Sequence, residues 1–303
     1  MSNMKVNFAG VEFANPVVTG SGTFGFGKEY GEYVDIAQLG GITLKGLTLA
    51  MREGNKPPRI AETPAGILNS VGLQNPGVKY FVSRELPKLA QSGTRLIANI
   101  AGNTIEEYCE MAQILSDSAI DLIEMNISCP NVKEGGVAFG VCPDTVERIT
   151  SAVRKHCKKP LVVKLSPNVT DITETARAAE SGGADGISLI NTLLGMKIDI
   201  KTRRPVLANN VGGLSGPAVK PVAVRMVWQV ANAVKLPIIG MGGIMTGEDA
   251  VEFLLAGATL VSVGTANFVD PAASIKVRDG IAKYMQENGV SDVNELIGAV
   301  KPN

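Results

Sequence analysis

The sequence has very little of what several classes of binding protein and enzyme need. Its 303 residues contain one His, one Trp, five Tyr and eight Phe, and 29 Lys and Arg balance 29 Asp and Glu. A chain with no net charge and few aromatic rings is not expected to bind nucleic acid or an anionic membrane surface. The single histidine, His156, lies in a basic segment just before a predicted strand. We therefore expect no acid–base chemistry by histidine in the active site.

The chain also lacks paired cysteines and targeting signals. Its four cysteines form no C-x-x-C pair: Cys109, Cys129, Cys142 and Cys157. We therefore expect no disulfide framework, no metal site and no iron–sulfur cluster built by this chain alone. Residues 1–8 show no basic segment followed by an apolar run, and Gly, Ser, Thr and Asn interrupt the longest uncharged apolar stretch, residues 253–269. These features predict a cytoplasmic protein with reduced thiols, no signal peptide and no membrane span.

Eight short apolar runs of strand type alternate with helical patterns. The predicted strands cover residues 15–20, 41–45, 95–100, 121–127, 161–166, 185–190, 237–242 and 259–264. Continuous apolar strands separated by helices are typical of a parallel sheet covered by helices. Eight such units predict a (β/α)8 TIM barrel that takes up the whole chain, residues 1–303, as one domain. A doubly wound parallel sheet is the structural alternative.

The segments between the strands predict helices, a hairpin and two insertions. Thr104 and Glu107 form a capping-box pattern for a helix that runs toward Asp117. Further helices are predicted over residues 144–157, 171–180, 217–234 and 247–256. Residues 5–13, turning at Ala9-Gly10, predict an N-terminal hairpin that closes the bottom of the barrel. Long βα insertions, residues 59–77 and 191–216, are expected to form walls or lids over the C-terminal face, where barrel active sites lie.

Polar residues stand at or just past the C-terminal ends of most predicted strands. They are Ser21, Lys45, Asn99, Asn126, Cys129, Lys164, Asn191 and Thr192. For each of them alone, the end of a strand is the alternative explanation. Together, two lysines and three asparagines with few carboxylates predict a site for an anionic ligand. Since each asparagine can donate and accept, the set also suits a planar ring with amide or imide edges.

The last two strands end in glycines instead. Gly242-Gly243 and Gly264-Thr265 occupy the positions from which barrels commonly bind a phosphate through backbone N–H groups. Ordinary tight turns are the alternative. The G-x-G-x-x-G match at residues 20–25 is not expected to bind a dinucleotide, because the next strand ends in Lys45 rather than in an acidic residue. The sequence therefore indicates one phosphate-bearing cofactor at the barrel mouth and no NAD site.

Cys129, Lys45, Lys164 and Glu124 are the remaining candidates for moving a proton. Cys129 follows the fourth strand and precedes a glycine-hinged loop, residues 132–140, of the kind that closes over substrate. A thiol can act as a base near neutral pH, although a lone cysteine is also commonly a small buried apolar residue. Lys164 has two interpretations: a Schiff-base lysine, or a cation beside a flavin that becomes negative on reduction. The asparagines and the glycine turns favour the flavin.

Four of these segments resemble dihydroorotate dehydrogenase, a flavoenzyme family of pyrimidine synthesis. They are NSVGLQN at residues 69–75, NISCPN at 126–131, VKLSP at 163–167 and GMGGI at 240–244. The similarity runs over residues 15–268. Cysteine at position 129 is similar to the soluble class I. The segments at residues 21–30, 133–140 and 212–220 resemble the NAD-linked B-type catalytic subunit more than the fumarate-linked A-type.

The resemblance implies a role for each matching residue. FMN would be contacted by Ser21, Lys45, Gly46, Asn99, Asn126, Lys164, Ile190, Gly216, Gly242, Gly243, Gly264 and Thr265. Dihydroorotate would be held by Lys45, Asn69, Ser70, Val71, Gly72, Leu73, Asn126, Asn191 and Thr192. Cys129 would remove the C5 proton while the C6 hydride passes to the flavin.

The resemblance also implies partners. In the B-type enzyme a second subunit carries FAD, a [2Fe–2S] cluster and the NAD site, and joins a homodimer of catalytic subunits in a heterotetramer. Four alternatives remain open at this point. They are a fumarate-linked dihydroorotate dehydrogenase, a flavoprotein like dihydropyrimidine dehydrogenase, a flavin-binding regulatory protein without turnover, and a Schiff-base lyase that uses Lys164.

Overall fold

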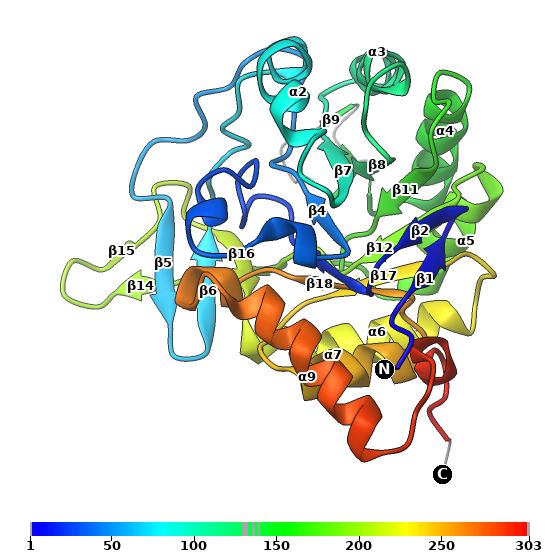
Figure 1. Ribbon diagram of the computed structural model, residues 1–303. Coiled ribbons are helices and arrows are strands. Elements are labelled where there is room, and N and C mark those ends of the chain that lie inside the picture. The colour runs from blue at the N-terminus through cyan, green and yellow to red at the C-terminus, as the bar shows by residue number, and fades with distance from the viewer. Residues whose placement is uncertain (1, 129–132, 135–136, 139, 302–303) are drawn as a thin grey trace.

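The centre of the molecule is a closed barrel of parallel strands (Figure 1). The computed structural model describes residues 2–128, 133–134, 137–138 and 140–301. The barrel strands are β3 (Val17–Thr19), β4 (Gly41–Thr43), β7 (Arg95–Ile100), β8 (Leu122–Asn126), β11 (Leu161–Lys164), β12 (Gly186–Leu189), β17 (Ile238–Met241) and β18 (Leu260–Val263). They pair in chain order, and β18 pairs with β3 to close the ring. The predicted (β/α)8 barrel is confirmed, and the doubly wound alternative is wrong.

The pairing register determines which side chains face the inside of the barrel. Asn99 on β7 pairs with Glu124 on β8, and Lys164 on β11 pairs with both Asn126 and Ser188. Paired residues point to the same side of a sheet, as do alternate residues along one strand. These five side chains therefore share the inner face. Two positions earlier on the same strands, Ile97, Leu122 and Val162 are buried aliphatic residues, so the inner face is polar only toward the C-terminal ends of the strands.

Helices follow most of the barrel strands. They are α3 (Ile105–Ser116), α4 (Pro143–Arg154), α5 (Ile172–Ser181), α6 (Lys220–Ala231), α7 (Gly247–Ala256), α8 (Ala266–Val269) and α9 (Ala273–Glu287). The N-cap half of the predicted capping box of α3 is confirmed, since Thr104 Oγ1 accepts a hydrogen bond from Glu107 N at 3.3 Å. The Glu107 carboxylate accepts from Asn103 N at 2.6 Å instead of from Thr104 N. The helix predicted over 144–157 ends earlier, at Arg154, whose guanidinium binds the carbonyl of Lys159 and so holds the chain in a turn.

The sequence reasoning did not predict α9. Its buried side chains form a narrow stripe that includes Val277 and Ile281, and Gly280 interrupts the helical pattern. The glycine is there because α7 packs very closely: a Cβ atom at Gly280 would lie 2.8 Å from Gly247 Cα. The helix predicted over 217–234 begins with a 3-10 turn, η4 (Pro217–Val219), and its α-helical part ends at Ala231.

The N-terminal hairpin closes the bottom of the barrel as predicted. Strands β1 (Val6–Phe8) and β2 (Val11–Phe13) pair antiparallel, and Ala9 and Gly10 turn with φ of 51° and 85°. Phe8 and Phe13 are fully buried. A Cβ atom at Gly186, the first residue of β12, would lie 2.7 Å from the Phe8 ring, so the ring reaches the entrance of the barrel.

The two long insertions join in one antiparallel sheet, which the sequence reasoning did not predict. Its order is β13 (Leu193–Gly195), β16 (Gly212–Ser215), β6 (Gly66–Asn69) and β5 (Ile60–Thr63). A small hairpin, β14 (Ile198–Asp199) with β15 (Arg204–Pro205), projects beyond it. Figure 1 shows this sheet and the β1–β2 hairpin on opposite sides of the barrel. The insertions therefore form one shared wall at the C-terminal face.

The other elements are short. Residues 78–89 form a helical segment made of α1 (Val78–Tyr80), a π-helical turn η3 (Phe81–Glu85) and α2 (Leu86–Leu89). The remaining 3-10 helices are η1 (Tyr30–Glu32), η2 (Ile36–Gln38) and η5 (Val293–Leu296), and β9 (Lys133–Glu134) pairs with β10 (Val137–Ala138). Within the described ranges, no helix has the length and apolar character needed to cross a bilayer.

Candidate active site

A cavity of about 810 Å³ lies between the C-terminal ends of the barrel strands and the β13–β16–β6–β5 sheet. The predicted site residues that line it are Ser21, Lys45, Gly46, Asn69, Ser70, Val71, Gly72, Leu73, Asn99, Asn126, Lys164, Ile190, Asn191, Thr192, Gly242, Gly243, Gly264 and Thr265. Gly216 does not line it but lies directly behind Gly243. Cys129 lies outside the described residues. The structure thus brings into one cavity residues that are spread over most of the sequence.

Lys45 gives one wall of this cavity a positive charge. Burial lowers the pKa of Lys45, and the nearby charge of Arg59 lowers it further. Arg59 belongs to the first insertion and donates to Gln74 Oε1 at 2.5 Å and to Asn55 O at 3.2 Å. Two cations held close together in a partly buried place favour an anionic ligand, which would relieve their repulsion.

Three side chains form a hydrogen-bonded group at the ends of β8 and β12. The Ser128 hydroxyl donates to Asn126 Oδ1 at 2.7 Å and accepts a hydrogen bond from Asn191 Nδ2. The Asn191 Oδ1 atom accepts from Thr192 N at 2.9 Å. Because the oxygen of Asn126 is occupied in this way, its NH₂ group is the part left to bind a ligand.

The segment from Asn69 to Leu73 crosses the cavity and is held from outside. Asn55 donates through Nδ2 to Ser70 O at 2.8 Å, and Asn69 Nδ2 lies 3.5 Å from Gly213 O on β16. Ser70 Oγ is buried and has no hydrogen-bond partner among the described residues. A loop fixed through its backbone in this way can offer its side chains to a ligand without first becoming ordered.

The loops after β17 and β18 have the shape of a cradle. Gly242 and Gly243 have φ of 125° and 82°, and a Cβ atom at Gly243 would lie 2.9 Å from both Gly216 O and Lys220 N. No other residue fits there without displacing backbone. Thr265 Oγ1 donates to Ser215 Oγ at 2.9 Å and so ties the second loop to the insertion sheet.

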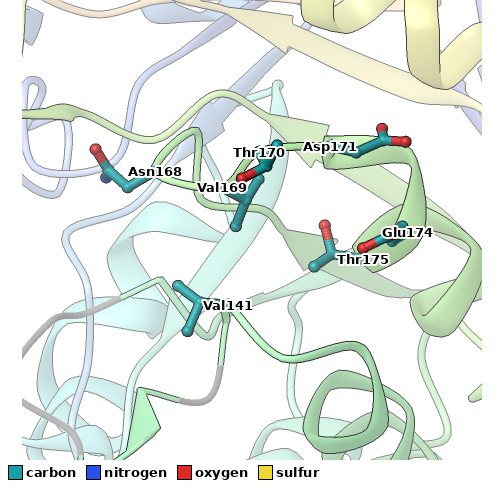
Figure 2. Close-up of a pocket in the computed structure, with 7 residues that line it drawn as sticks. All are labelled: Val141, Asn168, Val169, Thr170, Asp171, Glu174 and Thr175. Carbon is teal, nitrogen blue, oxygen red and sulfur yellow. The ribbon is translucent and has the colours of Figure 1, made fainter.

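A second, smaller cavity of about 240 Å³ lies beside the first (Figure 2). It shares Val141 and Asn168 with the large cavity, and the rest of its lining comes from the segment leading into α5. Asp171 caps that helix by accepting from Thr173 N at 2.9 Å, and this hydrogen bond lowers the pKa of Asp171. None of the predicted site residues lines this cavity. Among the described residues, no group of three or more His, Cys, Asp or Glu is placed to hold a metal ion.

Comparison with known proteins agrees with this arrangement. The family model described as dihydroorotate dehydrogenase matches residues 3–285. The chain belongs to the dihydroorotate dehydrogenase family. It is 63% identical to a protein of Alkaliphilus metalliredigens, over 98% of this chain and 99% of that one. It is 60% identical to a protein of Lachnoclostridium phytofermentans and 56% identical to one of Bacteroides thetaiotaomicron, each over 99% of this chain and all of the relative. All three relatives are named dihydroorotate dehydrogenase B (NAD(+)), catalytic subunit.

Two side chains of this dihydroorotate dehydrogenase family member were not predicted as site residues. Ser128 lies inside the NISCPN segment, and its position between Asn126 and Cys129, both predicted site residues, was the available signal. Arg59 could not be found from sequence, because it acts on Lys45 only after the first insertion has folded back over the barrel. Glu124 was a candidate for moving a proton, but it does not line the cavity and lies behind two residues that do.

Proposed function

We propose that this chain oxidises dihydroorotate to orotate in pyrimidine biosynthesis, with FMN in the large cavity and NAD⁺ as the final electron acceptor. One observation carries the proposal. The lysines and asparagines predicted from strand ends line one cavity at the active face of a barrel, in a chain that belongs to this family. The relatives' shared name supplies the substrate and the NAD⁺.

The residues of the cavity fit a flavin mononucleotide. Asn99 Oδ1 is buried and has no hydrogen-bond partner among the described residues, so it is available to accept from the N–H of an imide edge. Gly242, Gly243, Gly264 and Thr265 would bind the phosphate, with Gly216 supporting that loop from behind. Ser21, Lys45, Gly46, Asn126, Lys164 and Ile190 would contact the rest of the molecule. When bound, FMN supplies a two-electron acceptor for the hydride that leaves substrate C6.

The remaining residues of the cavity suit dihydroorotate. Lys45 would bind its carboxylate, and the amides of Asn69, Asn126 and Asn191 would bind its ring edges, together with Ser70, Val71, Gly72, Leu73 and Thr192. Cys129, as thiolate, would take the C5 proton. Loss of that proton and of the C6 hydride leaves the C5=C6 double bond of orotate, so atoms and charge balance.

The proposal includes partners. The relatives are named as catalytic subunits, and a catalytic subunit implies another subunit. We propose that the second subunit carries FAD, a [2Fe–2S] cluster and the NAD⁺ site, and that it joins a homodimer of this chain in a cytoplasmic heterotetramer. The chain itself would be one FMN-binding domain.

A Schiff-base lyase is the less favoured function. Such an enzyme needs a free amine that attacks a carbonyl. Lys164 Nζ lies 3.8 Å from the Glu124 carboxylate, and this ion pair suits a fixed charge beside a cofactor better than a nucleophile.

The deciding experiment is an anaerobic absorbance spectrum of the purified chain, before and after addition of dihydroorotate. We expect oxidised-flavin bands that bleach on addition. Flavin bands that bleach with a dihydropyrimidine lacking the carboxylate, and not with dihydroorotate, would replace the substrate but keep the cofactor. A colourless protein that takes up no FMN would refute the proposal. Electron transfer to NAD⁺ that requires a co-purified yellow-brown subunit would support the partner assignment.

A further inference from the structure

A carboxylate is buried behind the wall of the large cavity. Glu124, on β8, has 1% of its surface exposed, and its neighbours on the inner face, Asn99 on β7 and Lys164 on β11, are 0% and 6% exposed. Asn99 and Lys164 line the cavity and Glu124 does not. Glu124 therefore does not contact a bound molecule, and it acts on one through these two side chains and through its charge.

The hydrogen bond between Glu124 and Asn99 fixes the direction of the amide. Asn99 Nδ2 lies 2.5 Å from Glu124 Oε2. An ionised carboxylate has no proton to donate, so the amide must turn its NH₂ group toward Glu124 and its oxygen away. The structure has this arrangement, and Asn99 Oδ1 is left without a partner among the described residues.

The absence of a side chain at Gly46 keeps this oxygen accessible. A Cβ atom at position 46 would lie 2.9 Å from Asn99 Oδ1. Both residues line the cavity. The oxygen is therefore an acceptor of fixed direction, presented to whatever occupies the cavity next to Gly46.

The same carboxylate also lies beside the charge of Lys164, with 3.8 Å between Glu124 Oε2 and Lys164 Nζ. Burying a charged pair costs free energy that such a loose contact does not fully recover, and apolar side chains of similar volume are commonly at least as stabilising in a protein interior. Stability alone is therefore a poor reason for a glutamate at this position.

We propose that Glu124 is a positioning residue that selects the flavin ring: it holds Asn99 so that Oδ1 accepts from the ring N3–H, and it partly offsets the charge of Lys164. The inference rests on the proposal that FMN occupies the cavity. Its first consequence is that the protein rejects a flavin whose N3 carries no hydrogen. Its second is that Glu124 weakens the binding of reduced, anionic FMN relative to oxidised FMN.

Two substitutions separate these roles. Glu124→Gln keeps an acceptor for the Asn99 amide but removes the negative charge beside Lys164. Glu124→Met removes both the acceptor and the charge at similar volume. The matched control is Asp121→Asn, at the residue just before the same strand, where the carboxylate pairs with Arg95 Nη1 at 3.0 Å and accepts from Leu96 N at 2.8 Å.

The first measurement compares FMN with N3-methyl-FMN in fluorescence titrations of the flavin-free full-length chain. For the unsubstituted protein we expect the methyl group to weaken binding by roughly 10–100-fold, the usual effect of leaving a buried acceptor unpaired. Glu124→Gln and Asp121→Asn should keep most of this preference. Glu124→Met should lose most of it, because its Asn99 amide is free to turn.

The second measurement is the midpoint potential of bound FMN relative to free FMN. In Glu124→Gln the ratio of reduced to oxidised FMN affinity should rise about tenfold, which for two electrons is about 30 mV toward positive values. Asp121→Asn should leave the potential unchanged. If Glu124→Met does not fold, two results still test the role of Glu124. They are the potential of FMN bound to Glu124→Gln and the preference of the unsubstituted protein for FMN over N3-methyl-FMN.

The outcomes distinguish this inference from the proposed function. No N3-methyl preference in the unsubstituted protein, or an unchanged potential in Glu124→Gln, would overturn the role of Glu124 while dihydroorotate still bleached the bound flavin. A chain that binds neither FMN nor its analogue would refute the proposed function itself.

Discussion

The side-chain amide of Asn191 donates a hydrogen bond to the hydroxyl of Ser128, and so joins the segment after β12 to the segment after β8. Ser128 in turn donates to Asn126 Oδ1 at 2.7 Å. This hydroxyl makes the shortest side-chain hydrogen bond to each of two amides that line the large cavity, and so helps to set their direction. If these amides bind dihydroorotate as proposed, substrate binding depends on Ser128 through its hydrogen bonds to them.

Ser128→Ala should therefore weaken substrate binding without loss of the cofactor. Each amide loses its shortest side-chain partner and keeps only longer or backbone hydrogen bonds, from Asn191 Nδ2 to Asn126 Oδ1 at 3.3 Å and from Thr192 N to Asn191 Oδ1 at 2.9 Å. We expect the Kd of orotate to rise by roughly 5–30-fold, the usual effect of one or two lost hydrogen bonds. The measurement is a titration of the flavin absorbance band with orotate. Ser83→Ala is the control, since the exposed Ser83 hydroxyl binds only the Tyr80 carbonyl. An unchanged Kd in Ser128→Ala would show that the asparagines are fixed by other contacts.

Cys129→Ala should keep the flavin colour and lose turnover. Removal of a general base typically slows a reaction by roughly 10²–10⁴-fold, and stopped-flow bleaching of the flavin by dihydroorotate measures this step directly. Cys109→Ala is the matched control, because that thiol is half-buried on α3, outside the barrel. Bleaching at a near-normal rate in Cys129→Ala would remove Cys129 from the mechanism.

Thiol alkylation should identify the same residue. Burial raises the pKa of both Cys109 and Cys157, so few of these thiols are ionised at neutral pH. These two thiols should therefore react slowly with iodoacetamide at pH 7. Cys142 is the N-cap residue of α4 and does not line the large cavity, so we expect loss of activity to follow labelling of Cys129, and bound orotate should slow it. Peptide mapping that finds label only on Cys109, Cys142 or Cys157 in the inactive protein would contradict this.

The affinity for orotate should begin to fall at a lower pH than it would if a lysine of ordinary pKa bound the carboxylate. Burial and the charge of Arg59 lower the pKa of Lys45 from 10.5, so its ammonium loses its proton at lower pH than a solvent-exposed lysine. An orotate carboxylate binds the ammonium form. The Kd should therefore be constant below the pKa of Lys45 and rise about tenfold per pH unit above it.

Three variants test that assignment. Lys45→Gln should bind orotate weakly with no such pH dependence. Arg59→Gln removes a like charge and should move the onset of the fall to higher pH, whereas Arg84→Gln, on the exposed face of the π-helical segment, should not. A Kd that stays constant to pH 10.5 in the unsubstituted protein would exclude Lys45 as the carboxylate-binding group.

The sequence predicted the barrel and the residues at its mouth because both are local patterns. Alternation of apolar runs with helical segments can be read over short windows, and the last residue of a parallel strand must lie at the C-terminal edge of the sheet. Lys45, Asn99, Asn126 and Lys164 were found in this way. Asn99, Asn126 and Lys164 share the inner face because of the pairing register, and a short stretch of sequence does not contain that information.

The insertion sheet could not be predicted because its strands pair with strands that are far away in the sequence. Leu68 pairs with Leu214, which is far away in the chain, and β16 begins with two glycines that give no strand alternation. The wall of the cavity therefore depends on contacts between two insertions that each look like a loop. Arg59 likewise comes close to Lys45 only when the first insertion has folded over the barrel. The contact between Asn99 and Glu124 could not be predicted without knowing that β7 and β8 are neighbours.

The cradle formed by the loops after β17 and β18 depends on Asp249, at the start of α7. Its Oδ1 accepts from Lys220 Nζ at 2.6 Å, and its Oδ2 accepts from Met245 N at 2.9 Å and from Thr246 N at 3.0 Å. Lys220 is the first residue of α6, and its backbone N lies next to Gly243. This carboxylate therefore fixes the distance between two helices whose N-terminal ends flank the proposed phosphate site.

Asp249→Asn should destabilise the fold and loosen FMN together. We expect a loss of about 1–3 kcal/mol in the free energy of unfolding at pH 7, measured by urea denaturation, and a faster release of FMN. Glu252→Gln is the matched control: Glu252 also accepts from Lys220 Nζ at 2.6 Å but is half exposed, so its loss should cost less. Equal effects of the two substitutions on FMN release would show that Asp249 does not hold the cradle.

The pH dependence of that stability has a defined sign. Burial alone would raise the pKa of Asp249, but hydrogen bonds from Lys220, Met245 and Thr246 lower it below its ordinary value of 3.8. A carboxyl with a lowered pKa in the folded state stabilises the fold above its unfolded pKa, and this contribution is lost as the pH falls through the folded value. The difference in unfolding free energy between the unsubstituted protein and Asp249→Asn should therefore be full at pH 7 and shrink below about pH 4. A difference that stays constant down to pH 2 would mean that the asparagine acts by distorting α7 rather than by removing this charge.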